Sequence, residues 1–261
     1  MITIKKGDIP AELITYSQAH DSAWEGPAVV QKNGAHLTFS DVKSILKKAL
    51  YREQSGLCAY CMRRLPSPDG DTGHHIIIEH ILCRERHIKR ALDYRNMVAC
   101  CNGCLGNQKA ACCDAHKRNK TLSFHFFDRP FHPEQLIKYD RKGVISSTNE
   151  SLNDDINKIL NLNHEMLKLN REAAYRGLIK KLNKRISDKK LSPIRLETEI
   201  KAELDAPSPY SGIIRFFLVR MLKKHAVNPN HKGRSSGSFT VGCKRHLSAR
   251  HTPAPNAHQT Q

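Results

Sequence analysis

The first regular pattern of hydrophobic and polar positions predicts a helix that begins near residue 40. Ser40 is a suitable N-cap, because its side chain can accept a hydrogen bond from the first helical turn. Apolar residues then recur at helical spacing, with lysines on the opposite face. The apolar positions are Val42, Ile45, Leu46 and Leu50. We expect this helix to end near Ser55-Gly56, just before a cysteine-rich segment.

The segment beyond Phe124 also predicts helices. An apolar stripe marks one long basic helix. Its members are Met166, Leu167, Ala174, Leu178, Leu182 and Ile186. Two Ser-Pro pairs, Ser192-Pro193 and Ser208-Pro209, have the pattern of an N-cap followed by proline at the first helical position. We therefore expect two further helices, over about 193–205 and 209–224.

The two ends of the chain lack such patterns. Residues 1–39 show no clear period and carry no secondary-structure prediction. Residues 226–261 contain no Asp or Glu and few large apolar residues, so they cannot bury a core, and we predict a disordered basic tail. The expected divisions are an N-terminal arm over 1–45, a central module over 46–122, a helical region over 123–225 and the tail over 226–261.

Charge narrows the class of partner. The 261 residues include 43 Lys and Arg but only 25 Asp and Glu, a formal net charge of +18. This excess indicates a polyanion, either nucleic acid or an anionic membrane surface. The longest apolar stretches, Ile76-Ile77-Ile78 and Phe216-Phe217-Leu218-Val219, are too short to span a bilayer. Because the first residues lack a secretion signal as well, we expect a cytoplasmic protein that binds nucleic acid and no membrane.

The cysteines suggest a metal site. Of nine cysteines, eight lie between Cys58 and Cys113, and clustered thiols in a reducing compartment favour a metal over disulfides. Cys58-Ala59-Tyr60-Cys61 is a CxxC knuckle, a turn that directs two thiolates at one tetrahedral ion. Two more ligands are needed. Three pairs are open: Cys101 with Cys104, Cys101 with Cys113, and Cys100 with Cys112; a second CxxC spacing favours the first pair.

A candidate hydrolytic pair lies between the knuckle and the later cysteines. The β-branched run Ile76-Ile77-Ile78 predicts a short buried strand and leads directly into Glu79-His80. In such a pair the carboxylate can bind a hard cation while the imidazole deprotonates water. Asn96 follows before a second short apolar run, and Asp114 directly follows Cys113. This context strengthens the Glu-His pair as a candidate site.

These motifs resemble the HNH nucleases, in which a ββα-metal fold carries the nuclease site within a zinc-braced hairpin and helix. The segment 113–117, Cys-Asp-Ala-His-Lys, is similar to the Cys-Asn/His-x-x-Lys ending of zinc-stapled members. A wider similarity, over about residues 40–180, is to the PtuB-like HNH proteins, which are nuclease subunits of Septu anti-phage systems and of some retron operons. The segments that carry it are 46–50, 54–61, 78–80, 93–97, 138–140 and 160–163.

The resemblance implies an architecture, a zinc site and a partner. The fold would be α+β and mainly helical, with a zinc-braced ββα-metal core, a C-terminal helical region and a disordered basic tail. The structural zinc ligands would be Cys58, Cys61, Cys101 and Cys113, with Cys104 as the alternative. The usual partner of PtuB-like proteins is an ABC/SMC-like ATPase, which the helical region would contact.

The resemblance also implies a reaction, metal-dependent hydrolysis of phosphodiester bonds. Glu79 and Asp114 would hold Mg²⁺ or Mn²⁺ beside the scissile phosphate. His80, as a neutral imidazole, would activate the attacking water. Asn96 would hold the loop or orient His80 through a hydrogen bond.

Other features extend this hypothesis or compete with it. Lys117 and Arg118, at the start of a helix after Asp114, would contact flanking phosphates. DNA is the first expectation for the target, with RNA, for example tRNA, as an alternative. A zinc-braced nucleic-acid-binding subunit without catalysis is a second alternative, although it has no need of the acidic and histidine residues together. Trp24, the only tryptophan, is expected to be a packing anchor rather than a base-stacking platform.

Overall fold

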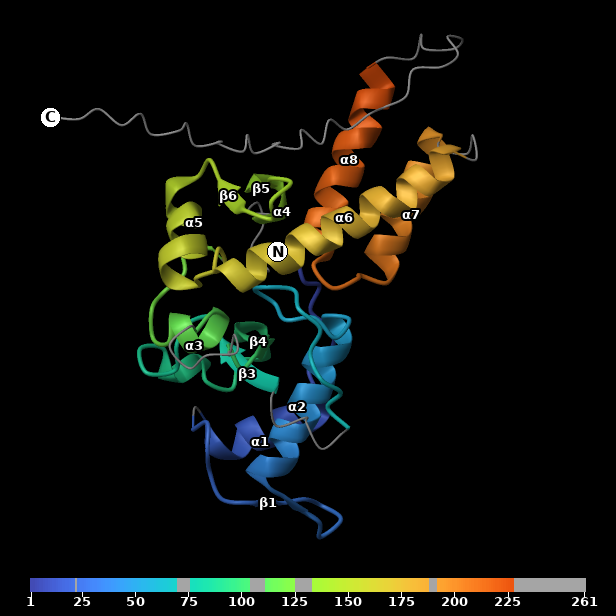
Figure 1. Cartoon of the computed structure of the whole chain (residues 1–261). Helices are drawn as coiled ribbons and strands as arrows, with labels where there is room; N and C mark the ends of the chain where they lie inside the picture. Colours follow the sequence, from blue (N-terminus) through green and yellow to red (C-terminus); the bar gives the residue numbers. More distant parts are fainter. Residues whose placement is uncertain (22, 70–75, 104–110, 125–132, 188–191, 228–261) are drawn as a thin grey trace, which may run out of the picture. The chain divides into compact units, whose positions relative to one another are not determined.

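Helices and short antiparallel hairpins alternate along the chain in the computed structural model (Figure 1). The structure describes residues 1–21, 23–69, 76–103, 111–124, 133–187 and 192–227. Cys104 and nearly all of the predicted basic tail lie outside these residues. Within them the fold is mixed, with helices and three separate two-stranded sheets.

The N-terminal segment contains two helices and a hairpin, and for its first 39 residues the sequence offered no prediction. Helix α1 spans Ala11–His20, the hairpin consists of β1 (Val29–Val30) and β2 (His36–Leu37), and α2 spans Phe39–Glu53. Only Leu13 and Tyr16 of α1 are buried, which is too few for a clear helical period in the sequence.

The predicted helix is α2, but its N-cap is Thr38 rather than Ser40. The Asp41 N–H group donates to Thr38 Oγ1 over 3.2 Å, and the Thr38 N–H group donates to Asp41 Oδ2 over 2.9 Å. This reciprocal pair is a capping box, which satisfies two backbone donors at once. Ser40 instead lies within the first turn of the helix.

The central segment is built on one antiparallel strand pair. β3 (Ile76–His80) pairs with β4 (Met97–Cys101), so the strand predicted at 76–78 is confirmed and continues to His80. All five residues of β4 are buried. The turns η2 (Ile88–Arg90) and η3 (Tyr94–Asn96) lie between the strands, and the short helix α3 (Cys113–Lys117) follows them.

A buried glutamine joins α2 to this strand pair. Just after the helix, the Gln54 side chain donates to the carbonyl groups of Leu57 and Ala99, each over 2.8 Å. It also accepts a hydrogen bond of 2.7 Å from the Ala99 N–H group. Because buried amide groups need such partners, this side chain fixes the end of α2 against the middle of β4.

The C-terminal segment contains the remaining elements, of which the long helix and the helix over 193–205 confirm predictions. In chain order they are α4 (Pro133–Leu136), β5 (Ile137–Tyr139), β6 (Ile145–Ser147), α5 (Glu150–Asp154), the π-helical turn η4 (Asp155–Ile159), α6 (Glu165–Ser187), α7 (Pro193–Asp205) and α8 (Ser211–Val227). β5 and β6 pair in antiparallel fashion.

Helix α8 begins two residues later than the second Ser-Pro pair predicted. The Ser208 hydroxyl donates to the Glu203 carboxylate over 2.7 Å, so it is engaged at the end of α7 rather than capping α8. Tyr210 has a φ of +61°, and its N–H group donates to Met62 O over 2.9 Å. A left-handed residue cannot continue a right-handed helix, which delays the start of α8.

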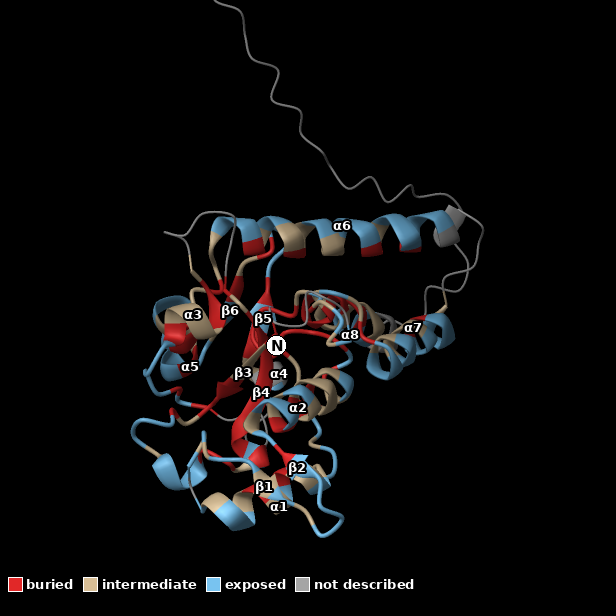
Figure 2. Cartoon of the chain, turned by 90° about the horizontal axis from the view of Figure 1, so that it is seen from below, coloured by how far each residue is buried: buried red, intermediate tan, exposed pale blue. Residues whose placement is uncertain are grey.

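The apolar stripe of α6 packs mainly against the rest of the chain. Leu167, Leu178 and Leu182 are buried, whereas Met166 is 46% exposed. Figure 2 shows the buried positions of α6 on one side and the exposed positions on the other. The side chain of Ile186 lies outside the described set. The stripe therefore serves mostly as internal packing.

Residues Met1–Val227 form one unit with a connected hydrophobic core. The divisions expected at 45/46 and 122/123 both fall inside this unit. Among the residues that the structure describes, none of the helices has the length and apolar composition needed to cross a membrane.

Removing the observed N-cap of α2 should destabilise the protein. We expect Thr38→Ala to lower the free energy of unfolding by about 1 kcal/mol, because one first-turn N–H group loses its acceptor. Ser40→Ala is the matched control and should change it by less than about 0.5 kcal/mol. Urea unfolding of both variants gives the two values. An equal or larger effect at Ser40 would contradict the capping assignment.

A four-thiol cluster beside a buried acidic site

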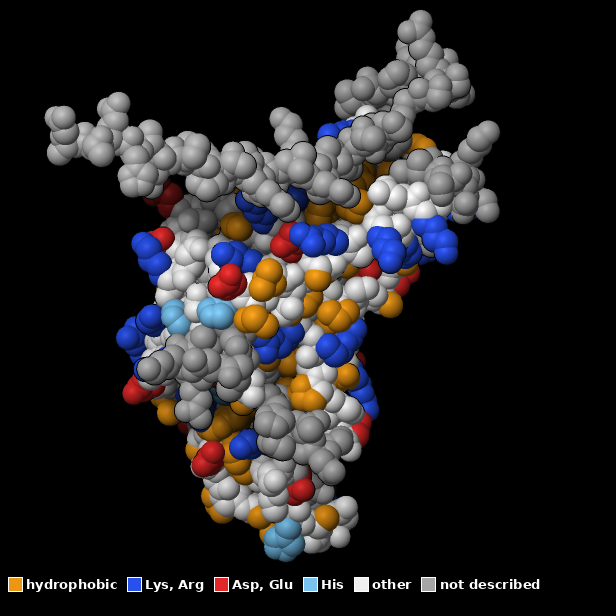
Figure 3. Space-filling view, viewed as in Figure 1, with side chains coloured by type: hydrophobic (Ala, Val, Ile, Leu, Met, Phe, Trp, Pro, Cys, Tyr) orange, Lys and Arg blue, Asp and Glu red, His pale blue; other side chains and the backbone are white. Residues whose placement is uncertain are grey.

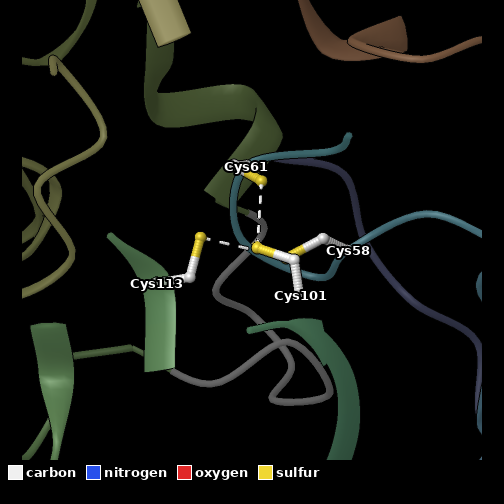
Figure 4. Close-up of side chains that lie close together, drawn as sticks. All are labelled: Cys58, Cys61, Cys101 and Cys113. Atoms are coloured by element: carbon white, nitrogen blue, oxygen red, sulfur yellow. Dashed lines mark hydrogen bonds between the residues drawn. The ribbon is translucent and has the colours of Figure 1, made fainter. Parts of the chain in front are cut away.

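Four buried cysteines from three chain segments converge on one point (Figure 4). Cys58 and Cys61 lie on the knuckle after α2, Cys101 ends β4, and Cys113 begins α3. Their sulfur atoms all lie within 4.8 Å of one another. Of the three pairs left open by the sequence, the structure thus brings Cys101 and Cys113 to the knuckle.

Backbone hydrogen bonds shape the knuckle. The Cys58 N–H group donates to Arg63 O over 2.9 Å, and the Met62 N–H group donates to Cys58 O over 3.0 Å. The Ala59 N–H group donates to Ala99 O over 3.0 Å, which attaches the knuckle to β4. The turn therefore holds the first two thiols beside the strand that ends with the third.

The fourth thiol approaches because a glycine leaves room for it. Gly103 has a φ of +73°, and a Cβ atom there would lie 2.5 Å from both Cys112 O and Ala115 Cβ. Only a residue without a side chain tolerates this backbone shape and this contact. The start of α3 can therefore pack directly against the chain that leaves β4.

Two contacts from the C-terminal segment fix α3. The Cys113 N–H group donates to Leu160 O over 2.9 Å. His116 Nδ1 lies 2.8 Å from Ile159 O, and because a carbonyl group only accepts, this nitrogen is the donor. His116 is thus engaged with the backbone of η4 and is oriented by it.

The donor set of the cluster fits a tetrahedral metal such as zinc. Four thiolates from a CxxC knuckle and two further cysteines form a common structural zinc site. Burial raises the pKa of Cys61 and Cys113. Burial also opposes ionisation of Cys58, yet hydrogen bonds from neighbouring thiols lower its pKa well below the ordinary value. A buried thiolate among thiols requires a compensating cation, which a bound metal supplies.

Two further buried thiols border the cluster. Cys112 Sγ lies 3.5 Å from Cys113 Sγ. Cys100 forms a hydrogen bond with Cys58 that contributes to the lowered pKa of Cys58. Neither belongs to the group of four that surrounds one point. The pair Cys100 with Cys112, open from the sequence, is therefore not the pair that faces the knuckle.

Glu79 lies in a buried acidic site next to the cluster. Its Oε1 atom is 2.7 Å from Lys117 Nζ and accepts a hydrogen bond of 2.9 Å from the Tyr60 hydroxyl. The pKa of Glu79 is raised to about 8, first by burial and then by a hydrogen bond with Asp114 and by the charge of Asp114, against the opposing effect of Lys117. The structure thus brings the two predicted cation ligands, Glu79 and Asp114, into contact.

His80 is held as a neutral imidazole. Its Nε2 atom lies 2.9 Å from Ala91 O, and the carbonyl group only accepts, so Nε2 carries the proton and Nδ1 carries the lone pair. The pKa of His80 is lowered to about 4, mainly by burial, with the Arg84 and Lys117 charges acting in the same direction. At neutral pH the ring is therefore unprotonated at Nδ1, which is the state that a general base requires before reaction.

Asn96 holds the loop that joins β3 to β4. Its Oδ1 atom accepts from the Leu82 N–H group over 2.8 Å, and its Nδ2 atom donates to Leu82 O over 2.9 Å and to Arg90 O over 3.2 Å. Of the two roles expected for Asn96, the described contacts match loop holding. The loop also contributes Ala91 O, which orients His80, so Asn96 supports the imidazole indirectly.

Lys117 and Arg118 occupy different places from those expected. They were expected at a helix start near flanking phosphates, whereas Lys117 is the last residue of α3 and Arg118 follows it at a φ of +51°. The Lys117 side chain is 1% exposed and also donates to His80 O over 3.1 Å. Lys117 therefore lies inside the acidic site. Arg118 is exposed.

Sequence reasoning missed two residues of this site. Tyr60, inside the CxxC knuckle, points its hydroxyl at Glu79. Trp24 packs edge to face on His80, with ring centroids 4.6 Å apart. Tyr60 lies between the two cysteines of the CxxC knuckle, and this position was a signal that it lies near the metal-binding thiols. Nothing in the pattern around Trp24 placed it beside His80.

No family model and no curated protein matches the chain. Two features of the chain indicate its function: the four-thiol cluster and the group formed by Glu79, His80 and Asp114.

The thiol cluster should bind one zinc per chain and stabilise the fold. Purified protein should contain about one zinc, and Cys58→Ser should lose it together with solubility, because metal binding joins the three segments and contributes folding free energy. Cys83→Ser, a buried cysteine outside the cluster, is the control and should keep the zinc. A folded, zinc-free Cys58→Ser protein would contradict the prediction.

Removing Lys117 should make stability depend more strongly on pH. Without the ammonium the pKa of Glu79 rises further above its unfolded value, so the folded state holds the proton more tightly and loses stability as pH rises through that pKa. At pH values above the pKa of the folded state, each added pKa unit lowers the free energy of unfolding by about 1.4 kcal/mol. Lys117→Met should therefore be more destabilising at pH 9 than at pH 6, measured by urea unfolding without added divalent ions.

Two comparisons make this test specific. Glu79→Gln combined with Lys117→Met should remove the additional pH dependence, because no carboxyl group remains to titrate at that position. Lys120→Met, at an exposed lysine near the end of α3, should leave the pH dependence of the parent protein unchanged. If Lys117→Met lowers the free energy of unfolding equally at pH 6 and pH 9, the ammonium does not act through Glu79.

Proposed function

We propose that the protein is a metal-dependent endonuclease that hydrolyses phosphodiester bonds of nucleic acid. The observation that carries this proposal is the contact of Glu79 with Asp114 directly beside a neutral His80. Two adjacent carboxyl groups suit a hard divalent cation, and a neutral imidazole suits proton abstraction from water. The element order of strand, strand and short helix, braced by four thiols, agrees with the ββα-metal type of nuclease.

The contacts within the acidic site suit a divalent cation. It already holds a cation, since the Lys117 ammonium lies 2.7 Å from Glu79 Oε1. Burial, followed by the adjacent Asp114, raises the pKa of Glu79 despite this ammonium, so the ionised carboxylate is incompletely stabilised and a divalent cation would stabilise it further. Bound Mg²⁺ or Mn²⁺ would supply charge stabilisation at the scissile phosphate.

The residues of the chain have separate roles in the proposed reaction. Glu79 and Asp114 would hold the cation, and His80 would take the proton of the attacking water at Nδ1. The Ala91 carbonyl group fixes the His80 tautomer through its hydrogen bond to Nε2. Tyr60 keeps its proton, because burial and the Glu79 charge raise its pKa well above the ordinary value. It can therefore continue to donate to Glu79 throughout.

Exposed cationic side chains support a nucleic-acid substrate. The loop between β3 and β4 carries a set of exposed arginines and a lysine: Arg84, Arg86, Lys89, Arg90 and Arg95. This loop begins directly after His80, so phosphates bound there would lie near the imidazole. Figure 3 shows further Lys and Arg side chains distributed over the face in view. DNA remains the first proposed target and RNA the alternative, since neither the cation nor His80 requires a 2′-hydroxyl group.

The PtuB-like resemblance supports a biological setting for this activity. We propose that the chain is the effector nuclease of a cytoplasmic anti-phage system and works with an ABC/SMC-like ATPase subunit. The exposed apolar residues of α6 and α7, Met166, Leu169, Ile194 and Leu204, are candidate contacts for that partner. A non-catalytic binding subunit is the less economical proposal, because burying a Glu, a His and a Lys together is costly without a use for them.

His80→Ala should abolish cleavage. Loss of a general base typically lowers the rate by a factor of about 100 to 10,000, and zinc content should stay at the parent level. The assay is cleavage of a plasmid and of total RNA with Mg²⁺ or Mn²⁺, with His36→Ala, at an exposed histidine, as the matched control. The two substrates separate a DNA target from an RNA target.

The purification must exclude contaminating nucleases, so all variants should be prepared in parallel.

Asp114→Ala should also be inactive and should recover partly at higher Mg²⁺ or Mn²⁺, because one carboxylate ligand remains. Full activity in both His80→Ala and Asp114→Ala would show that the cleavage site lies elsewhere. Binding of nucleic acid without cleavage under any condition would favour the non-catalytic alternative.

A further inference from the structure

Trp24 lies beside the candidate catalytic imidazole although it is far from it in sequence. The ring centroids of Trp24 and His80 are 4.6 Å apart with an interplanar angle of 86°. Phe39, the first residue of α2, also packs edge to face with the indole, and the two ring centroids are 5.2 Å apart. The segment before α2 thus delivers an aromatic side chain to the site.

Trp24 packs against the hydrophobic core, as expected for an anchor, but only part of its surface is used in this way. It is half-buried, whereas Tyr16 and Leu13 from the same segment are fully buried and already supply core contacts. The guanidinium carbon of Arg84 lies 5.2 Å from the indole centroid, in a cation–π arrangement. An indole that is partly exposed, next to a cationic side chain and a candidate base, therefore has a surface available to a ligand.

The neighbouring charges indicate what that ligand is. Arg84 is the first of the exposed cationic residues on the β3–β4 loop, and Arg86 and Lys89 follow it. Aromatic side chains flanked by Arg and Lys are typical of surfaces that bind single nucleic-acid strands, because bases stack on the rings while phosphates meet the cations. A peptide or a lipid would not match this combination of one ring and a row of cations as well.

We propose that Trp24 is a base-stacking residue, on which an unpaired nucleobase of the substrate stacks next to the scissile phosphate at His80. This inference rests on the proposed nuclease function and adds a substrate class, a strand with an unpaired base at the cleavage site. A base inside a duplex has both faces covered by its neighbours, so it must leave the stack to reach the indole.

The single tryptophan makes the contact directly observable. Because the chain contains one Trp, its fluorescence reports on this position alone. We expect a single-stranded oligonucleotide, titrated without added divalent ions, to quench the emission in a saturable manner and to shield it from acrylamide. A duplex of the same sequence should bind through the cationic loop with much less quenching. Deoxyribose and ribose versions of the strand separate DNA from RNA as the source of the base.

Affinity of the variants tests the energetic role. With a dye-labelled single strand and anisotropy detection, Trp24→Ala should weaken binding by about 5- to 150-fold, the range typical of losing one stacked base. Trp24→Phe should retain most of the affinity, because a phenyl ring still stacks. Val30→Ala, at an exposed apolar residue of the same segment, is the matched control and should bind like the parent. Zinc content and the unfolding midpoint of each variant identify any loss of fold.

The results separate this inference from the nuclease function. Quenching by the single strand in both the parent and His80→Ala, without cleavage by either, would support base stacking while the nuclease function fails. Cleavage by the parent together with unchanged Trp24 emission would overturn the stacking inference alone. If Trp24→Phe binds as weakly as Trp24→Ala while both remain folded, or if the duplex quenches as strongly as the single strand, the inference is also overturned.

Discussion

The architecture around the candidate site depends on the convergence of four thiols. Cys58 and Cys61, Cys101 and Cys113 belong to three segments that are separate in sequence, and backbone hydrogen bonds and the surrounding core also join these segments. The strand pair between them is only five residues long on each side, and α3 has a single turn and a little more. A metal such as zinc would add cohesion here to that of the surrounding apolar core.

The cluster also positions the chemistry. Tyr60 lies between the two knuckle cysteines and contacts Glu79, while Asp114 directly follows the fourth cysteine. Any displacement of the thiols would move both side chains relative to β3, which carries Glu79 and His80. The four-thiol cluster and the acidic site are therefore mechanically coupled, although one consists of thiols and the other of carboxyl groups, a lysine and an imidazole.

Features set by local pattern were predictable from the sequence. The β-branched run before Glu79 formed a strand, and the stripe beyond Phe124 formed α6, because both periods arise within one element. The knuckle was visible because its two cysteines are close in sequence. The pairing of Cys101 with Cys113 came from a family resemblance, and its physical reason, the room left at Gly103, appears only in three dimensions.

Features set by long-range contacts were not predictable. Lys117 was expected to contact flanking phosphates, but its ammonium is buried against Glu79 of β3. Thr38 and Ser40 are equally good caps in isolation, and the reciprocal contact with Asp41 decides between them. The position of Trp24 follows from how the first 40 residues pack on α2, which no local period encodes.

The clamp formed by Asn96 has a consequence for how such a protein can diversify. Because this one side chain bonds to both Leu82 and Arg90, the outer part of the β3–β4 loop is closed off from the strands at its base. Substitutions or insertions near the tip would change the cationic surface without moving Glu79 or His80. In the proposed nuclease, target preference and bond-breaking chemistry would therefore be able to evolve as separate modules of the same hairpin.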